Sequence, residues 1–174
     1  MIRPILIHPD PRLKKVCDPL PGVDETARRL IDDMLDTMYD APGIGLAAPQ
    51  IGVTRRLLVM DVADTEAGEA PEPLALVNPE ILAASEETRT HNEGCLSIPD
   101  VYYDVTRPAS VRVRYLDREG AEREREFEGL AATCVQHEID HLNGRLFIDY
   151  LGSIKRQMVT QKMRKLKRER ERTG

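Results

Sequence analysis

Residues 137–141, which read HEIDH, constrain this chain more than any other stretch. On an α-helix, residues four apart lie on one face about one turn from each other, so the imidazoles of His137 and His141 can reach one metal ion. Glu138 lies beside that face, from where it can handle the protons of a metal-bound water. Charged amphipathic helices can also contain this pattern by chance, so a metal site needs support from elsewhere in the chain.

A catalytic site of this kind needs a third protein ligand. In common metalloproteases that ligand lies downstream of the motif, but no histidine follows His141. The downstream acids are Asp149, which follows the motif too closely for the metalloprotease pattern, and two glutamates in a basic tail. Cysteine is the better candidate, and Cys95 follows Gly94, where the backbone can come close to another group. The alternative is a closed structural site that adds Cys134. A straight helix places Cys134 about 10 Å along its axis from His141, too far for both to hold one ion.

The remaining pattern predicts an α+β fold. Asp24 is expected to cap a first helix, whose apolar residues recur at helical spacing as far as Met38. The helix should end at residues 40–43, which read DAPG. A second helix is expected from about residue 129 through the two histidines to Gly144, and a third from about 153 to 174. Short apolar or alternating runs predict strands at 56–62, 74–77, 111–115 and 121–127, the last with helix as the alternative. We expect small antiparallel or mixed sheets packed around a central metal-binding helix, in a single domain spanning residues 1–174.

Composition and charge limit the setting of this chain. No apolar run approaches the ~18 residues of a membrane span, and the first apolar stretch is too short for a signal peptide. Three widely spaced cysteines indicate reduced thiols rather than a disulfide framework, so we expect a cytoplasmic protein without membrane contact. We also expect a monomer. Residues 151–174 carry nine Lys or Arg and two Glu, which is a net charge of +7, whereas the other 150 residues have a net charge of −12. This basic tail could bind nucleic acid or an acidic partner. The alternative is a solvated helix end without a partner.

Two further stretches accompany the histidine motif, GIGLAAPQ at residues 43–50 and EGCLS at residues 93–97. The first has neither the ending nor the spacing of a phosphate-binding loop, and its small residues form a strip along which another backbone can lie. Together, in this order, the three stretches closely resemble the motifs of peptide deformylase, and the likeness extends to a C-terminal helix of the bacterial type. This family removes the formyl group from the initiator methionine of new polypeptides. The resemblance therefore implies a metal-dependent hydrolase that releases formate.

The resemblance also implies roles for individual residues. The three metal ligands of the family correspond here to Cys95, His137 and His141. The ion is usually ferrous iron, Fe2+, although zinc, nickel or cobalt can substitute. Glu138 would take a proton from water and then give it to the leaving amine. Gln50 and the backbone N–H of Leu96 would donate to the oxygen that gains charge.

The same resemblance implies how substrate and partners bind. The nascent formylated polypeptide would lie as an added strand against Gly45 and Gly94. Its methionine side chain would enter an apolar pocket lined by Ile44, Leu130, Cys134 and the flank of His137. The basic tail would dock on the ribosome near its exit tunnel.

Some positions differ from the family's best-known bacterial members. His-Asn precedes the second motif at residues 91–92, and two tyrosines at 102–103 stand where an arginine is often found. Both stretches flank the expected cleft, so the substrate preference beyond the methionine is open. Arg107 and Asp140 are expected to support the metal ligands, with a plain surface ion pair as the alternative for Arg107.

Two rival functions use the same residues. A metalloprotease would cleave internal peptide bonds and would not depend on a formyl group. A structural metal domain that binds RNA through its tail would have a closed four-ligand site and no turnover.

Overall fold

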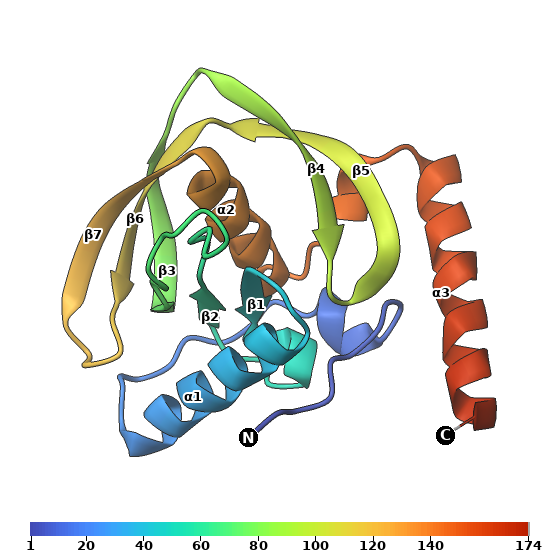
Figure 1. Cartoon of the computed structure of the whole chain (residues 1–174), viewed down its shortest axis with the longest axis horizontal. Coiled ribbons are helices and arrows are strands. Elements are labelled where there is room, and N and C mark those ends of the chain that lie inside the picture. Colours follow the sequence, from blue (N-terminus) through green and yellow to red (C-terminus); the bar gives the residue numbers. More distant parts are fainter. Residues whose placement is uncertain (174) are drawn as a thin grey trace.

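The computed structural model describes residues 1–173, which form two antiparallel sheets and three α-helices. The helices are α1 (Glu25–Asp40), α2 (Gly129–Leu142) and α3 (Ser153–Thr173). The strands are β1 (Gly45–Ala47), β2 (Leu57–Met60), β3 (Leu74–Ala84), β4 (Thr88–Cys95), β5 (Ile98–Pro108), β6 (Ser110–Leu116) and β7 (Glu122–Glu128). Figure 1 shows α2 enclosed between the two sheets, with α1 and α3 on the outside. The expected α+β fold around a central helix is confirmed.

The helix α1 forms where the apolar spacing predicts it. The Asp24 side chain accepts a hydrogen bond of 2.8 Å from the backbone N–H of Ala27, which caps the helix start. The apolar stripe of α1, including Ile31, Met34 and Met38, is fully buried against the first strands of the larger sheet. The helix thereby covers one face of that sheet.

The larger sheet has the strand order β1-β2-β3-β6-β7, and every neighbouring pair is antiparallel. Strand β2 alternates between the two faces, because Leu57 and Val59 pack toward α1 while Leu58 and Met60 pack toward α2. Such burial on both faces explains its continuous apolar sequence. The charged segment β7 is a strand, as expected, in which Phe127 is buried and Glu122 and Glu124 form exposed ion pairs with arginines of β6.

The smaller sheet is a hairpin of β4 and β5, and the strand predictions missed it. The buried residue of β4 is the charged Glu93, and one of the buried residues of β5 is Arg107. Strand β4 therefore lacks the apolar alternation by which a half-buried strand is detected, although Val101, Tyr103 and Val105 of β5 do alternate with exposed residues. Strand β3 is also longer than predicted, because Asn78 and Pro79, at a register shift with β6, separate the predicted run from the exposed outer half of the strand.

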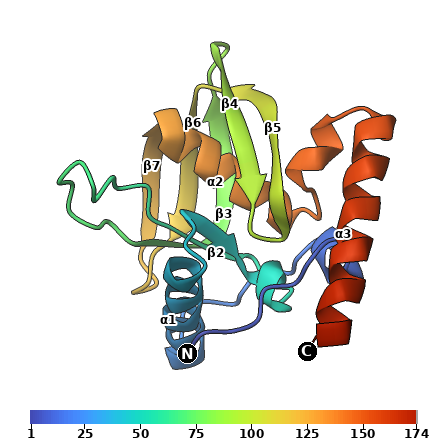
Figure 2. The same cartoon turned by 45° about the vertical axis from the view of Figure 1, so that its right-hand side comes forward.

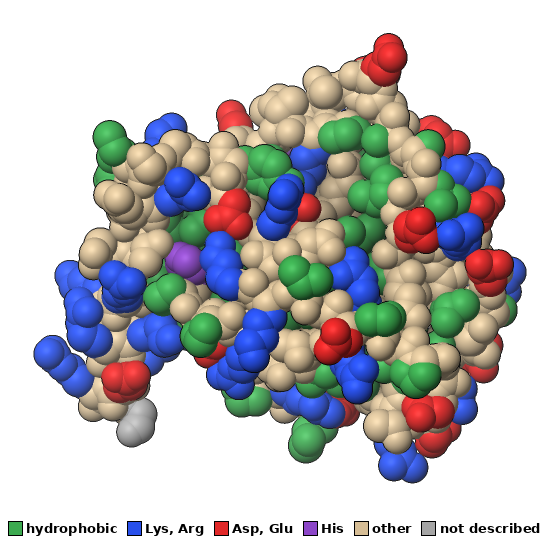
Figure 3. Space-filling model, turned by 180° about the vertical axis from the view of Figure 1, so that it is seen from behind, with side chains coloured by type: hydrophobic (Ala, Val, Ile, Leu, Met, Phe, Trp, Pro, Cys, Tyr) green, Lys and Arg blue, Asp and Glu red, His purple; other side chains and the backbone are tan. Residues whose placement is uncertain are grey.

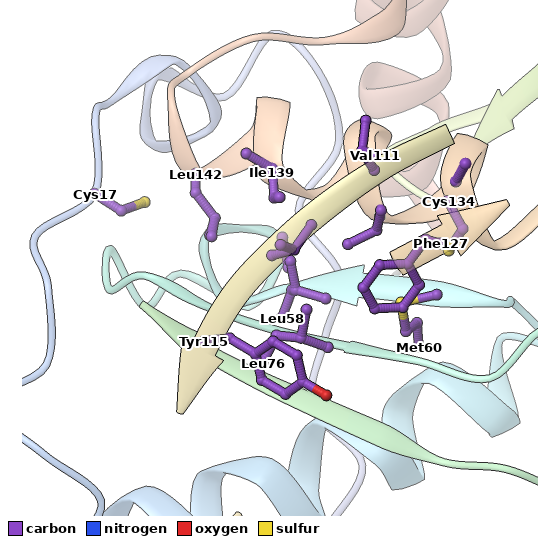
Figure 4. Close-up of a cluster of buried hydrophobic side chains, with 14 residues drawn as sticks. Cys17, Leu58, Met60, Leu76, Val111, Tyr115, Phe127, Cys134, Ile139 and Leu142 are labelled. Carbon is purple, nitrogen blue, oxygen red and sulfur yellow. The ribbon is translucent and has the colours of Figure 1, made fainter. Parts of the chain in front are cut away.

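Apolar side chains from α2 and from every strand of the larger sheet form the core beneath the helix. Figure 4 shows Leu58, Leu76, Val111 and Phe127 facing Ile139 and its neighbours on α2. Each side chain of this size contributes ~1.5–3 kcal/mol when fully buried. The core therefore holds α2, with its two histidines, in one position relative to the sheet.

The helix α3 packs against the hairpin rather than extending into solvent (Figures 1 and 2). Val159 and Met163 are buried in a cluster with Val105 of β5 and with residues of the segment before α3. The Thr160 hydroxyl lies 2.9 Å from Nε2 of His8, which anchors the helix to the N-terminal segment. None of the helices in residues 1–173 is both long and apolar enough to span a membrane. The basic tail is thus an integral helix with an exposed charged face.

Candidate metal centre and active site

Three metal-binding side chains meet where the β4–β5 hairpin approaches α2. Cys95 ends β4, and His137 and His141 lie one turn apart on α2. Their ligand atoms all lie within 4.8 Å of one another, and Sγ of Cys95 is 3.4 Å from Nε2 of His141. A thiolate and two imidazoles suit zinc and ferrous iron, so this group fits a divalent ion. Cys134 lies outside the group, with its Sγ atom 3.6 Å from the carbonyl oxygen of Ile44, as expected for a wall residue.

A buried network of charges orients the ring of His137. Its Nδ1 atom lies 2.9 Å from Oε1 of Glu93. Arg107 donates two hydrogen bonds to Glu93, at 2.7 and 3.0 Å, and one to Asp140 at 2.8 Å, and the Tyr150 hydroxyl donates to the same Asp140 oxygen at 2.8 Å. Burial opposes ionisation of Glu93, but the hydrogen bonds from His137 and Arg107 outweigh it and hold the pKa of Glu93 below its usual value. Since Nδ1 of His137 is engaged, Nε2 is the nitrogen left for a metal ion.

Glu138 presents a buried carboxylate oxygen to this group. The residue is 4% exposed, and its Oε1 atom has no hydrogen-bond partner among residues 1–173. Oε1 lies 4.0 Å from Nε2 of His141, and burial raises the pKa of the carboxyl to about 7. Unpaired buried polar groups are uncommon in native proteins and cluster at functional sites. A carboxyl with a pKa near neutrality can both accept and donate a proton at physiological pH.

The amide of Gln50 is held in one orientation beside the metal-binding group. Gln50 lies in the 3-10 helix η2 (Ala48–Ile51) and is 1% exposed. Its Oε1 atom accepts a 2.9 Å hydrogen bond from the backbone N–H of Ala47, so its Nε2 atom faces Ser97 Oγ at 3.0 Å and Cys95 Sγ at 3.6 Å. Leu96 follows Cys95 in the turn between β4 and β5. One potential donor therefore lies beside the Cys95 sulfur in space, and the other follows Cys95 directly in the chain.

These groups form the floor of a cleft of about 1040 Å³. All five residues expected to bind substrate line it, namely Ile44, Gly45, Gly94, Leu130 and Cys134. A Cβ atom at Gly45 would lie 2.6 Å from Oε2 of Glu138 and 2.8 Å from Sγ of Cys134, so a larger residue would clash there. Glycine therefore brings the β1 backbone close to the Glu138 carboxylate.

Comparison with known proteins identifies the chain. A model of the polypeptide deformylase family matches residues 2–157. The chain belongs to this family. It is 58% identical to a peptide deformylase of Rhizobium meliloti over 164 residues, which cover 94% of this chain and 93% of the relative.

Solved deformylase structures share the fold. The crystal structure of peptide deformylase from Ehrlichia chaffeensis has a TM-score of 0.92 and 38% identity, and the match covers 97% of this chain and 98% of that one. A Met-Ala-Ser bound structure of a peptide deformylase from Acinetobacter baumannii has a TM-score of 0.81 and 34% identity, over 87% of this chain and 99% of that one. The expected activity is confirmed, since deformylases are hydrolases that remove the N-terminal formyl group of nascent polypeptides. Membership favours this activity over a protease or a structural metal domain.

The motifs did not indicate every residue of the deformylase cleft. Residues 2–5 and Arg170 near the end of α3 also line it, whereas Tyr102 of β5 lines it as its predicted place beside the cleft implied. The N-terminal segment reaches the cleft because the backbone N–H of Leu6 donates to the carbonyl oxygen of Gln50 at 2.7 Å. Contacts between segments so far apart leave no local pattern. The role of Glu93 was also missed, although its place within the EGCLS motif, two residues before Cys95, was a usable signal.

Proposed function

We propose that Cys95, His137 and His141 bind one divalent ion, ferrous iron in the cell, with zinc, nickel or cobalt able to replace it. The grouping of the three donors and the engagement of Nδ1 of His137 support this ligand set. A thiolate and two neutral imidazoles leave the bound ion with one positive charge, which lowers the pKa of water in the site.

Glu138 acts first as a general base and then as a general acid. The observation that carries this proposal is its buried Oε1 atom, which lies beside the metal-binding group without a hydrogen-bond partner in residues 1–173. Glu138 accepts a proton as water adds to the formyl carbon and delivers that proton to the leaving amine nitrogen. Formate and a peptide with a free methionine amine are released.

Gln50 and the backbone N–H of Leu96 donate to the formyl oxygen as it becomes negative. The Gln50 amide is supported by Ala47 and Ser97, so its orientation precedes substrate binding. Donors that are fixed before the reaction need no reorganisation when charge develops, which is why such groups stabilise transition states strongly.

The substrate is an extended peptide that lies between the free edges of β1 and β4. Among the described strands, β1 pairs only with β2 and β4 only with β5, so each offers an unpaired edge next to the cleft. Gly45 and Gly94 contact the peptide backbone, and the methionine side chain enters the pocket lined by Ile44, Leu130 and Cys134. The Met-Ala-Ser bound structure of the related Acinetobacter baumannii enzyme supports binding of a short peptide that begins with methionine. The direct test is formate release from formyl-Met-Ala-Ser by protein loaded with Fe2+ under anaerobic conditions, with zinc-loaded protein compared in air.

Replacing Cys95 by Ser is expected to remove most of the bound metal, whereas Cys134→Ser should stay loaded. A hydroxyl is a poor, protonated substitute for a thiolate ligand, and Cys134 lies outside the donor group. The measurement is metal content per chain after anaerobic purification, by elemental analysis. An empty site in folded Cys134→Ser protein would mean that the ligand set is wrong.

The enzyme works as a cytoplasmic monomer that docks on ribosomal RNA near the exit tunnel through α3. The Lys and Arg side chains of α3 are exposed except for Lys167, which is half-buried. Figure 3 shows Lys and Arg side chains gathered over this helix, along the left edge of the molecule. The +7 charge of residues 151–174 complements the phosphate backbone of RNA.

Neutralising this face should weaken ribosome binding without affecting turnover of a short peptide. Deleting α3 is a poor test because Val159 and Met163 belong to the core. The triple variant Arg156→Gln, Lys165→Gln, Arg168→Gln removes exposed charges instead, and Lys15→Gln, Arg29→Gln, Arg55→Gln is the charge-matched control. Co-sedimentation with ribosomes across a salt series gives the slope of the logarithm of the binding constant against the logarithm of the salt concentration. For the α3 variant this slope should be shallower than for the wild type by about 0.7–0.9 for each RNA phosphate that the variant no longer neutralises. Equal binding by the two triple variants would exclude docking through α3.

A further inference from the structure

Tyr102 is an exposed aromatic residue at the cleft that the proposed chemistry does not use. It lies on the outer face of β5, where it is 62% exposed, and it lines the cleft. Its hydroxyl has no hydrogen-bond partner within residues 1–173. No hydrogen bond within the described residues therefore explains the hydroxyl group at this position.

The ring of Tyr102 lies directly against the backbone of Gly94. A Cβ atom at Gly94 would be 2.5 Å from Cε1 and 2.7 Å from Cδ1 of the ring. The ladder between β4 and β5 shifts its register between Glu93 and Cys95, so Gly94 lies at this irregularity. An aromatic ring that covers a neighbouring glycine fills the space of the missing side chain. The ring and Gly94 both line the cleft.

The side chains of β4 alternate on either side of this edge. Glu93 points inward to His137, and Cys95 points inward to His141, whereas the Cβ direction of Gly94 points outward to Tyr102. Successive side chains of an added strand also alternate between the two faces. If the formyl-methionine side chain occupies the inner pocket, as the proposed function requires, the side chain of the second residue faces outward beside Gly94 and the ring.

We infer that Tyr102 is a specificity-determining residue, which favours substrates with a large apolar or aromatic side chain directly after the methionine. The ring supplies the contact surface that Gly94 lacks. Adjacent aromatic or apolar side chains on paired strands attract one another. A small second residue, such as alanine, gains little from this surface. The inference rests on the proposed binding mode and adds a preference at the second residue.

The test is the kcat/KM for formyl-Met-X-Ser peptides in which X is Phe, Leu or Ala. The metal-loaded enzyme should prefer Phe and Leu over Ala by about three- to tenfold. This ratio should fall to about one in Tyr102→Ala and be retained in Tyr102→Phe, which keeps the ring. Thr106→Ala is the matched control, because Thr106 is another exposed residue on the same face of β5 but does not line the cleft. It should keep both the ratio and the rate.

Other outcomes would overturn the inference. If folded Tyr102→Ala protein keeps the wild-type ratio, the inference is overturned, but the proposed deformylase function is not affected. A Tyr102-dependent preference in formyl-Met-Ala-X peptides, with none at the second residue, would exclude the alternation argument. Failure of the metal-loaded wild type to release formate from every peptide would instead refute the proposed function, so the two failures are distinguishable.

Discussion

Glu138→Gln protein is expected to keep its metal and to release formate about 10²–10⁴-fold more slowly than the wild type. The amide has nearly the same shape as the carboxylate but cannot accept the proton of water or deliver it to the leaving amine. Formate release from formyl-Met-Ala-Ser and metal content should be measured on the same sample. Glu126→Gln, which alters an exposed glutamate of β7, is the control and should have wild-type activity.

The same variant should unfold less readily at alkaline pH. In the metal-free protein, the pKa of Glu138 rises from 4.5 to about 7 on folding, so the folded state binds more protons than the unfolded state between these values. The contribution of the protonated Glu138 carboxyl to the stability of the wild type is therefore lost as pH rises from 4.5 through 7. Glutamine has no such proton to lose and avoids this loss. Denaturation of the apoproteins at pH 8 should show the variant more stable by up to about 3 kcal/mol.

Near-normal turnover by metal-loaded Glu138→Gln protein would refute the role of Glu138 in proton transfer.

Gln50→Ala is expected to lower kcat by ~100–1000-fold and to change KM little. Its amide donates mainly to an oxygen that becomes negative in the transition state, and one such donor contributes roughly 2.7–4 kcal/mol. Steady-state kinetics on formyl-Met-Ala-Ser separates the two constants. Stability should be measured alongside, because the change also removes the partner of the Ala47 N–H.

Gln136→Ala provides the matched comparison for Gln50→Ala. Gln136 is also buried, but its amide donates to the carbonyl oxygens of Pro108 and Ala132. Its loss should lower stability and leave kcat close to the wild-type value. An effect of Gln50→Ala on KM alone would assign Gln50 to binding of the ground state.

Elements whose signals are local were predictable from the sequence. Asp24 caps α1 at the expected place, and the apolar spacing identified its buried face. The helical spacing of His137 and His141 predicted that both rings meet one ion, and the structure brings them together with Cys95. In each case the relevant residues lie on one element or within one short motif.

The rest depends on contacts between distant segments. Arg107 pairs with Glu93, which is 14 residues away in the chain, and with Asp140, which is 33 residues away. Arg107 and Glu93 are buried, although charged residues in a sequence are normally expected on the surface. Burial of these charges is possible because each has a hydrogen-bonded partner of opposite sign. Strand β4 was missed for this reason, whereas β5 carries an apolar alternation that was a usable signal. The packing of α3 was not evident either, since Val159 and Met163 are few among many charges.

The two unpaired edges beside the cleft also bear on the range of proteins that the enzyme can process. Strands β1 and β4 offer backbone N–H and C=O groups, which occur in every polypeptide whatever its side chains. Recognition through the backbone depends little on sequence, whereas a cleft lined by selective side-chain pockets would reject part of the proteome. In the proposed binding mode, one active site can therefore serve many different chain starts, and side chains that face the bound peptide, such as Tyr102, would adjust the rate at which each is processed.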